Sequence, residues 1–453
     1  MNLVVFSGGT ATNSLTSCFS QLSVEQQCEL TYVLPISDNG GSTSEILRVF
    51  GGPAIGDIRS RIVRVISDGQ VARLLSYRLP NHGAKAKEEW NEILEGSHLI
   101  WKGLPTELKE ICRAFFVNFQ AELLKRTKVS NPFKFEKASI GNIFLTGARL
   151  FLGSLDASIE LMMRLGRGDP KIHVAPCINS VHTHHIAALL ANDEVITGQS
   201  QISHPSRPFM EKRANSVADL TRDRFLHLER SDGFTVDESE QDIGEEEEEY
   251  ANPLYILPEL KNSQLHFDKI DMDDKLPAPI KSLLYINPYG EEIKPPGNSR
   301  VIADIKKADM LVYSIGSLVT SLLPIVILGN IADAILESKP LRKVLLLNNR
   351  YDRETSWLDG LGYVKLLVDS MSRAALKYRQ TRNDRNFSRI QRQWSEFVTD
   401  LVYLKNGEIV IDEREFASKG IQCHAIDSDQ LDNDSLAGIL EMIGNINRKR
   451  TED

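Results

Sequence analysis

Short runs of apolar and β-branched residues recur along the chain, and each run ends in glycine, serine or asparagine. Several runs are continuously apolar rather than alternating, which is typical of strands buried on both faces of a parallel sheet. Helical periodicity lies between them, over Asn13–Gln27, Asn142–Leu165 and Leu318–Ser338. This order of strand, polar turn and helix predicts an α/β fold with a Rossmann-like, doubly wound, mostly parallel sheet. The expected strands are Leu3–Phe6, Leu30–Ile36, Lys171–Ile178, Leu283–Ile286, Met310–Tyr313 and Lys343–Asn348.

Two stretches interrupt this alternation and divide the expected core into three parts. One stretch has a helical pattern rich in charged and aromatic residues, so we expect a helical insertion there. The other includes Pro253, Pro258, Pro277 and Pro279, has few long apolar windows, and contains a dense acidic run. After the core we expect a C-terminal helical segment with a final strand that returns to the sheet. The expected core is residues 1–70, 139–204 and 281–360, the insertions are residues 71–138 and 205–280, and the C-terminal segment is residues 361–453.

Charge is distributed unevenly along the chain. The net charge of the 453 residues is −9, but Glu229–Glu249 alone contains eleven acids and one base, which gives −10 and leaves +1 for the rest. A broadly basic nucleic-acid-binding protein is therefore not expected. Repulsion within the acidic run predicts a partly disordered, solvated loop, with a partner-binding role as the alternative. Arg373–Arg392 contains seven bases opposed only by Asp384, which indicates a solvated helix or contacts to phosphate.

The remaining composition suggests a cytoplasmic protein. No CxxC motif occurs among the five cysteines, so we expect reduced thiols. The N-terminus lacks the pattern of a secretory signal. The apolar window Ile315–Leu336 contains Pro324, Asn330 and Asp333, which argues against a membrane span. A nuclear location stays open because of Arg448-Lys449-Arg450. The cysteines are Cys18, Cys28, Cys112, Cys177 and Cys423.

The first candidate site is the sequence SGGTATNSL, residues 7–15, directly after the first expected strand. Gly8 and Gly9 allow a tight turn and a close approach of backbone amides to a ligand. The following helix would direct its positive N-terminus towards the same position. The segment is neither a GxGxxG fingerprint nor a P-loop. A phosphate site that includes Thr10 and a simple turn are both compatible with it.

The second candidate site, residues 37–62, follows the second expected strand. It provides two carboxylates, Asp38 and Asp57, and the guanidinium of Arg59. A polyphosphate with Mg²⁺ needs such a mixture of oxygen ligands and forked donors. In the alternative interpretation Asp38 caps a helix and Asp57 pairs with Arg59. The further polar or flexible positions of this segment are Asn39, Gly40, Gly41 and Ser42.

Three later positions complete the candidate set. Asn142 is either a helix N-cap or a side chain that reaches a base or sugar. Gly316 and Ser317 lie between a strand and a helix, where a helix N-terminus would attract an anion. Asn348 ends the last apolar strand. By contrast, His182, His184 and His185 precede two strands around an Asn192-Asp193 turn, so alternation separates His184 from the other two and a zinc site is not expected.

The ordered set of motifs resembles the 2-phospho-L-lactate transferase and gluconeogenesis-factor superfamily. Bacterial gluconeogenesis factors show DDGGSSG, PPGDIRN, GNLLL, GESNI and GPGSLYTSIIPN at the matching places. The resemblance covers residues 1–62, 139–204 and 283–360, and more loosely the rest. The corresponding motifs here are SGGT, SDNGGSTSEILRVFGGPAIGDIR, SIGNIFLTGARLFLGSLDASIELMMRL, ITGQSQI, IKKADMLVYSIGSLVTSLLPIVILGNIADAI and KVLLLNN.

The resemblance implies a Rossmann-like core and a choice of two activities. Transferase members move a phospholactyl group from a guanylyl-activated donor to a deazaflavin alcohol and release GMP, with Mg²⁺ present. Gluconeogenesis-factor members bind nucleotide sugars and regulate carbon metabolism without an established reaction. Carried over by motif, Gly8, Gly9 and Thr10 would face phosphate; Asp38, Asn39, Gly40, Gly41 and Ser42 would line the cleft; Asp57 would lie near the acceptor or metal; and Asn142, Gly316, Ser317 and Asn348 would complete the nucleotide pocket.

Several departures from the family pattern bear on this expectation. Ala11 replaces a further glycine, Asn39 replaces the second acid of DDGG, and Gln199 replaces the glutamate of GES. In the segment RETSWLDGLGYV, Gly362 and Tyr363 replace the aspartate and histidine of GETxxYxxxDHV. The acidic insertion has no counterpart in compact members.

Two interpretations therefore stand. In the first, the protein is an Mg²⁺-dependent phospho-group transferase in which Asp57, Arg59 and Asp38 are catalytic and the two aspartates hold the metal. In the second, the same pocket holds a GDP-type nucleotide or a UDP-sugar as an effector, and a partner reads the bound state. Neither interpretation involves nucleic acid or a membrane, and a homodimer is common for such cores.

Overall fold

The computed structural model describes residues 2–9, 11–38, 40–127, 131–203, 275–338, 341–382 and 393–452. Thr10, Asn39, the acidic run Glu229–Glu249 and the end of the basic stretch lie outside these residues, so the expectations for them stay predictions.

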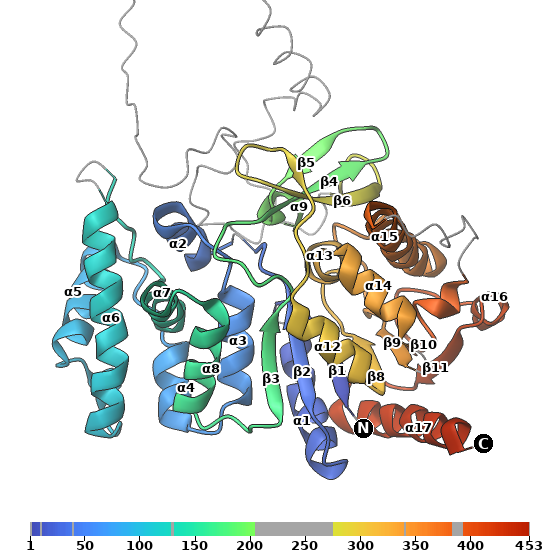
Figure 1. Ribbon diagram of the computed structural model, residues 1–453, viewed down its shortest axis with the longest axis horizontal. Coiled ribbons are helices and arrows are strands. Elements are labelled where there is room, and N and C mark those ends of the chain that lie inside the picture. Colours follow the sequence, from blue (N-terminus) through green and yellow to red (C-terminus); the bar gives the residue numbers. More distant parts are fainter. Residues whose placement is uncertain are drawn as a thin grey trace, which may run out of the picture.

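The centre of the protein is a parallel sheet of seven strands in the order β11-β10-β9-β8-β1-β2-β3 (Figure 1). Helices flank this sheet, so the predicted α/β class is confirmed. Every residue of β1, β2, β8 and β9 is buried, as their continuous apolar runs predict. The strands are β1 (Leu3–Phe6), β2 (Leu30–Leu34), β3 (Ile172–Pro176), β8 (Met310–Tyr313), β9 (Arg342–Leu346), β10 (Asp400–Leu404) and β11 (Gln422–Ile426).

The chain reverses its direction across the sheet at β1. From β1 it proceeds through β2 to β3, and from β8 it proceeds through β9 and β10 to β11 on the other side. Leu3 pairs with Leu30 of β2 and with Met310 of β8, so β1 and β8 are neighbours in register. In doubly wound sheets, ligands bind at the carboxyl ends of the strands where the strand order reverses. That position here lies between the ends of β1 and β8.

The helices on the β2–β3 side of the sheet form a large lateral group (Figure 1). The expected single helix over Asn142–Leu165 is two helices, because Gly153 has a φ of +67° and Ser154 caps the second one through its hydroxyl. Aromatic rings pack between α5, α6 and α7, including Trp90 against Phe116. The helices are α2 (Ser42–Phe50), α3 (Gly56–Val65), α4 (Gly69–Ser76), α5 (Gly83–Glu95), α6 (Thr106–Arg126), α7 (Ile140–Leu152) and α8 (Leu155–Leu165).

A second, antiparallel sheet has the order β5-β4-β6-β7. Its strands are β4 (His185–Leu190), β5 (Val195–Thr197), β6 (Ile280–Ile286) and β7 (Glu292–Ile293). The expectation that Leu283–Ile286 belongs to the parallel sheet is wrong, since Leu283 pairs with Ala188 of β4. A run of four apolar residues does not specify its partner strand. The expected insertion is also too long, because Leu276 is buried and leads directly into β6.

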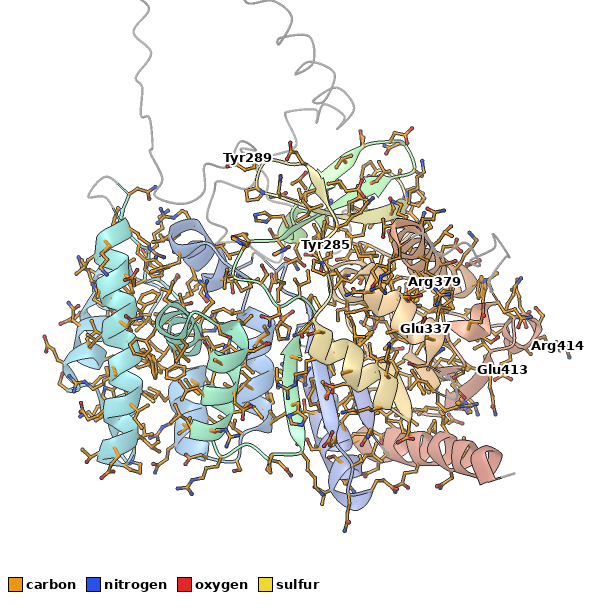
Figure 2. All side chains as sticks on the ribbon, viewed as in Figure 1. Tyr285, Tyr289, Glu337, Arg379, Glu413 and Arg414 are labelled. Carbon is orange, nitrogen blue, oxygen red and sulfur yellow. The ribbon has the colours of Figure 1, made fainter. Side chains whose placement is uncertain are left out.

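The second sheet lies beyond the carboxyl ends of the central strands, next to α13 (Leu323–Val326) and α15 (Gly360–Thr381) (Figure 1). Figure 2 shows Tyr285 of β6 at this junction. Its hydroxyl donates a 2.7 Å hydrogen bond to the carbonyl of Pro324 and is fully buried. The second sheet is therefore anchored to the edge where strand-end ligands bind.

The remaining helices complete both sides of the sheet. One final strand was expected after residue 360, but the described residues there include two, β10 and β11, each paired in parallel to its neighbour. The expected helix over Leu318–Ser338 is a π-helical turn, Leu318–Leu322, followed by α13 and α14 (Gly329–Glu337). Figure 2 shows Glu337 of α14 beside Arg379 of α15, an ion pair of 3.3 Å. The others are α1 (Thr16–Glu25), α9 (Gln199–Ser203), α12 (Ser299–Lys307), α16 (Glu413–Ser418) and α17 (Asn433–Glu452), with a 3₁₀ turn at Ala11–Leu15.

In the described parts of the chain no single helix is long and apolar enough to cross a bilayer. One bent pair, Leu318–Val326 with Gly329–Glu337, meets the criterion jointly, with a bend of 74° between its halves.

Candidate functional site

Four neighbouring strands bring the predicted segments to one edge of the sheet. The turn after β1 contains Gly8 and Gly9, the turn after β2 contains Asp38, the turn after β8 contains Gly316, and Asn348 follows β9. Because β9, β8, β1 and β2 are consecutive and parallel, their carboxyl ends lie side by side. The sheet topology thus joins segments that are more than 300 residues apart in the sequence.

Asp38 and Asp57 form a pair of neighbouring carboxylates at this edge. The backbone N–H of Gly9 donates to the Asp57 carboxylate, and a Cβ added to Gly9 would lie 3.7 Å from Asp57 Oδ1. Asp57 opens α3 beside Gly56, where an added Cβ would lie 3.7 Å from Asp38 Oδ2. The Oδ1 atom of Asp38 accepts from the N–H of Gly40 at 2.9 Å. The first glycine turn and both aspartates therefore share one small region.

The charges of this pair are incompletely compensated. Burial, followed by the negative charge of Asp38, raises the pKa of Asp57 to about 7, against the opposing effects of the Gly9 N–H, Arg61 and Arg59. Burial also raises the pKa of Asp38. Both side chains retain partial exposure, so a ligand can reach them. Two adjacent carboxylates of raised pKa are typical of sites that bind a cation or transfer a proton.

The alternative roles considered for the two aspartates are not those that the structure shows. Gly41, with a φ of +56°, is the N-cap residue of α2, and no side chain caps that helix. Asp38 instead closes a short turn onto Gly40. In the described part of the chain Arg59 forms no ion pair within 4.0 Å, so Asp57 and Arg59 do not make direct contact.

Asn142 connects the starts of three helices. Its Oδ1 atom accepts from Arg59 Nε of α3 at 3.3 Å, and its Nδ2 atom donates to Ser42 Oγ of α2 at 3.1 Å. The N-cap residue of α7 is Ser139, so Asn142 is not the cap. A Cβ on the preceding Gly141 would lie 2.4 Å from the Leu75 carbonyl, which explains the glycine. The side chain of Asn142 is 1% exposed and fixes Arg59 in place.

The turn after β8 packs directly on the turn after β1. A Cβ on Gly8 would lie 2.3 Å from the Cβ atom of Ser321, so only glycine fits there. Gly316 has a φ of +142° and is held by Asn348, which accepts from its N–H at 3.1 Å and donates to its carbonyl at 2.7 Å. Asn348 thus positions the loop through its amide, and its role in a ligand pocket stays a prediction.

Glu354 is a site residue that the sequence analysis did not select. Its carboxylate accepts from the hydroxyl of Ser317, from the N–H groups of Val319 and Thr320 at 3.2 Å each, and from Thr320 Oγ1 at 2.8 Å. Burial and the neighbouring Asp352 raise its pKa to about 7. The donors expected to bind an anion after β8 are therefore occupied by this carboxylate. The sequence signal was the RET segment, which we treated only as a departure from the family pattern.

Arg61 is a second such residue. It lies one helical turn after Asp57 on α3 and is fully buried. Its guanidinium donates to Thr16 Oγ1 at 2.5 Å and lies 4.6 Å from the centre of the Tyr32 ring. Its positive charge lowers the pKa of Asp57. The spacing of four residues from Asp57 in a helical pattern could have identified it.

At this edge the aspartate pair offers two neighbouring carboxylates that could hold a metal ion. The described residues contain no group of three or more histidine, cysteine, aspartate or glutamate side chains that could hold a metal ion. His184 Nδ1 donates to the carbonyl of His182 at 3.0 Å, and burial lowers the pKa of His185 in β4 to about 4. Asp38 and Asp57 fit Mg²⁺, which commonly takes one or two protein carboxylates and completes its shell with water and substrate phosphate.

The sequence is similar to known proteins, in one case over almost the whole chain. The chain is 62% identical to the uncharacterized protein YNL011C of Saccharomyces cerevisiae over 449 residues, which cover 98% of this chain and 99% of that protein. A shorter match of 95 residues, 30% identical, links it to a protein of Thermotoga maritima that carries a gluconeogenesis-factor name; it covers 21% of this chain and 29% of that protein.

Solved structures support the fold. Two crystal structures of protein BH3568 from Bacillus halodurans, a member of the UPF0052 family, superpose with TM-scores of 0.58 and 0.54. Each is 15% identical to this chain, and they cover 98% and 97% of it and 99% and 98% of BH3568. At this identity the likeness concerns the fold alone.

The family model for 2-phospho-L-lactate transferase CofD matches residues 3–436. The chain therefore belongs to the 2-phospho-L-lactate transferase CofD family, as its motifs predicted.

Proposed function

We propose that this protein transfers a phospho-group from a nucleoside-diphosphate-activated donor to an alcohol acceptor. The observation that carries the proposal is the partly exposed Asp38–Asp57 pair beside the Gly8–Gly9 turn, at the reversal point of the sheet. Donor phosphates would lie against the glycine turn, because backbone amides and the following helix N-terminus favour anions. The family match supports a nucleotide ligand.

The protein side chains have separable roles in this proposal. Asp38 and Asp57 would hold Mg²⁺, which when bound neutralises the phosphate charge that develops during transfer. Arg59, fixed by Asn142 at 3.3 Å, would stabilise charge on the transferred group. In an arrangement in which Asp38 alone holds the cation, Asp57, with its pKa raised to about 7, would accept the proton of the acceptor hydroxyl near neutral pH.

A second candidate function is that of a nucleotide-sugar-binding regulator. The occupation of the Ser317 and Thr320 donors by Glu354 favours it, because these donors are not available to a second phosphate in this arrangement. In that case ligand binding would displace or tighten the Glu354 contacts, and a partner would read the change. The short match to the Thermotoga maritima protein is in line with this alternative.

Calorimetry of the full chain separates the two functions. Guanosine and uridine diphosphates and their sugar derivatives are titrated with and without Mg²⁺, and ³¹P NMR then follows the mixtures for phosphoester products. A transferase binds with Mg²⁺ dependence and releases product on an alcohol acceptor. Binding that is indifferent to Mg²⁺, with no product from any donor, would replace the transferase by the regulator. No binding across the panel would overturn both.

The variant Asp57→Asn refines the result. In a transferase it should leave nucleotide affinity within a few-fold and reduce turnover by about 10²–10⁴, the range of a positioned acid–base group. In a regulator it should weaken binding by about 1–3 kcal/mol, because a donor loses its acceptor. Asp427→Asn, an exposed acid on the surface, is the matched control and should change neither quantity.

A further inference from the structure

Two arginines converge on the first turn of α7 without a carboxylate partner. The Cγ and Cδ atoms of Arg59 lie 2.8 Å from the position of a Cβ on Gly141, so this side chain fills the space that the glycine leaves. Arg78 lies next to the same turn, since its backbone forms an antiparallel bridge with Ser139 and its guanidinium donates to the Lys137 carbonyl at 3.2 Å. Like charges are thus held together at one place.

The charge of these arginines is not balanced locally. In the described part of the chain neither Arg59 nor Arg78 forms an ion pair within 4.0 Å. Burial, followed by the charge of Arg78, lowers the pKa of Arg59 to about 10, and the charge of Asp57 acts in the opposite direction. Arg78 is exposed, so a ligand from solution can reach this place. Two neighbouring cations are unfavourable unless an anion joins them.

The start of α7 supplies further donors. α7 has 13 residues, and the N–H groups of its first turn lack intrahelical acceptors by geometry. The first of them, that of Ile140, donates to the Tyr77 carbonyl at 3.0 Å, so the available donors are those of Gly141 and Asn142. Its N-cap residue, Ser139, makes no capping hydrogen bond, and its hydroxyl is 0% exposed and has no partner. A buried hydroxyl without a partner is costly, so this one is expected to have a ligand or water partner in the working protein.

We propose that Arg59, Arg78 and Ser139 at the start of α7 form an oxyanion subsite that binds a phosphoryl group next to the Asp38–Asp57 pair. Forked guanidinium donors and a helix N-terminus match the oxygens of phosphate, and a carboxylate would use the same donors less completely. The existence of the subsite stands on these contacts. Its role, binding the anionic part of the donor or acceptor, rests on the proposed function.

The experiment titrates inorganic phosphate into the metal-free full chain at low ionic strength, by calorimetry. The variants are Arg78→Gln, Ser139→Ala and, as matched control, Arg73→Gln. Arg73 lies five residues before Arg78 and donates to the Lys102 carbonyl. Arg78→Gln should weaken phosphate binding by about tenfold to hundredfold, Ser139→Ala should weaken it several-fold, and Arg73→Gln should change it less than twofold. Parallel titration with acetate distinguishes a phosphoryl site from a carboxylate site.

Unfolding measurements show whether a variant loses phosphate binding because it is less stable. Arg78 is exposed and faces a like charge, so Arg78→Gln should keep or slightly raise the melting temperature without phosphate and lose most of the rise that phosphate produces in the wild type. Asp57→Asn should tighten phosphate binding, because it removes a neighbouring negative charge. Loss of binding in Asp57→Asn but not in Arg78→Gln would place phosphate at the glycine turn and overturn the subsite.

The failures of the two proposals are distinguishable. If phosphate binding depends on Arg78 but no nucleotide binds, the subsite stands and the proposed function falls. If nucleotides bind with Mg²⁺ and phosphate binding is the same in the wild type and Arg78→Gln, the subsite falls and the proposed function stands. The absence of any phosphate binding at tens of millimolar would also overturn the subsite.

Discussion

Replacing Asp57 by asparagine should stabilise the protein at alkaline pH and leave its stability unchanged at acidic pH. In the folded protein the pKa of Asp57 is raised from 3.8 to about 7 by burial and by Asp38. The folded state therefore holds the proton more tightly than the unfolded chain. The stability carried by the protonated carboxyl is complete below about pH 4 and is lost as the pH rises through 7. Asparagine resembles the neutral carboxyl and does not ionise, so the variant does not lose this stability as the pH rises.

The size of the effect follows from the shift. About three pKa units at about 1.4 kcal/mol each give a ceiling of about 4 kcal/mol. Partial exposure to water reduces this value, so we expect Asp57→Asn to exceed the wild type by about 1–3 kcal/mol in unfolding free energy at pH 8. At pH 4 the two proteins should agree within about 0.5 kcal/mol.

Urea denaturation at half-unit pH intervals from 4 to 8 provides the assay, with Asp427→Asn as the control. Asp427 is an exposed acid paired with Lys405 at 3.4 Å, so its replacement should leave the pH profile parallel to that of the wild type. Added Mg²⁺ should stabilise the wild type at pH 8 and not Asp57→Asn. If the difference in unfolding free energy between Asp57→Asn and the wild type does not grow with pH, the claim that the charges of Asp38 and Asp57 are incompletely compensated is refuted.

Two further predictions concern the loops that frame the site. Glu354→Ala removes the acceptor of two backbone N–H groups and two hydroxyls, so the unfolding free energy measured in urea should fall by about 2–4 kcal/mol. The control Glu337→Ala replaces an exposed acid and should lower it by less than about 0.5 kcal/mol. Equal effects of the two variants would mean that the Glu354 contacts do not hold the loop. Gly8→Ala should cost about 1–3 kcal/mol and weaken ligand binding, because its methyl group would overlap Ser321, and Ser321→Gly should restore part of the loss. Gly69→Ala, with nothing within 4 Å, is the matched control, and comparable losses in the two alanine variants would contradict the steric argument.

The sequence was most informative where local chemistry leaves one solution. The bounds of β1 and β8 match the predicted runs, because four consecutive apolar residues before a glycine or serine turn are typical of a strand buried on both faces. The glycine turns and the polar segments after β1, β2, β8 and β9 were identified for a similar reason. Parallel strands place their carboxyl ends at one edge, so the common location of these segments followed from the pattern.

Only the tertiary structure shows which strands pair and which side chains that are distant in the sequence come into contact. The pairing of Leu283–Ile286 with β4 could not be read from the run itself, because strand-forming residues are equally suited to either sheet. Likewise, no local pattern marks Arg78, and the RET segment that contains Glu354 does not show which donors its carboxylate meets. Glu354 reaches Ser317 across 37 residues, and Arg78 reaches the start of α7 across 61 residues, through a loop and a backbone bridge respectively.

The sequence by itself thus determined the class of fold, the family and the identity of the strand-end turns, since each depends on residues adjacent in the chain. Only the folded structure decided that Asp38 lies beside Asp57 with no compensating cation in contact among the described residues, and that the donors after β8 already hold a carboxylate. The energy of a charged group depends on its burial and on every neighbouring charge. Those neighbours come from four strand ends that meet only when the sheet is complete.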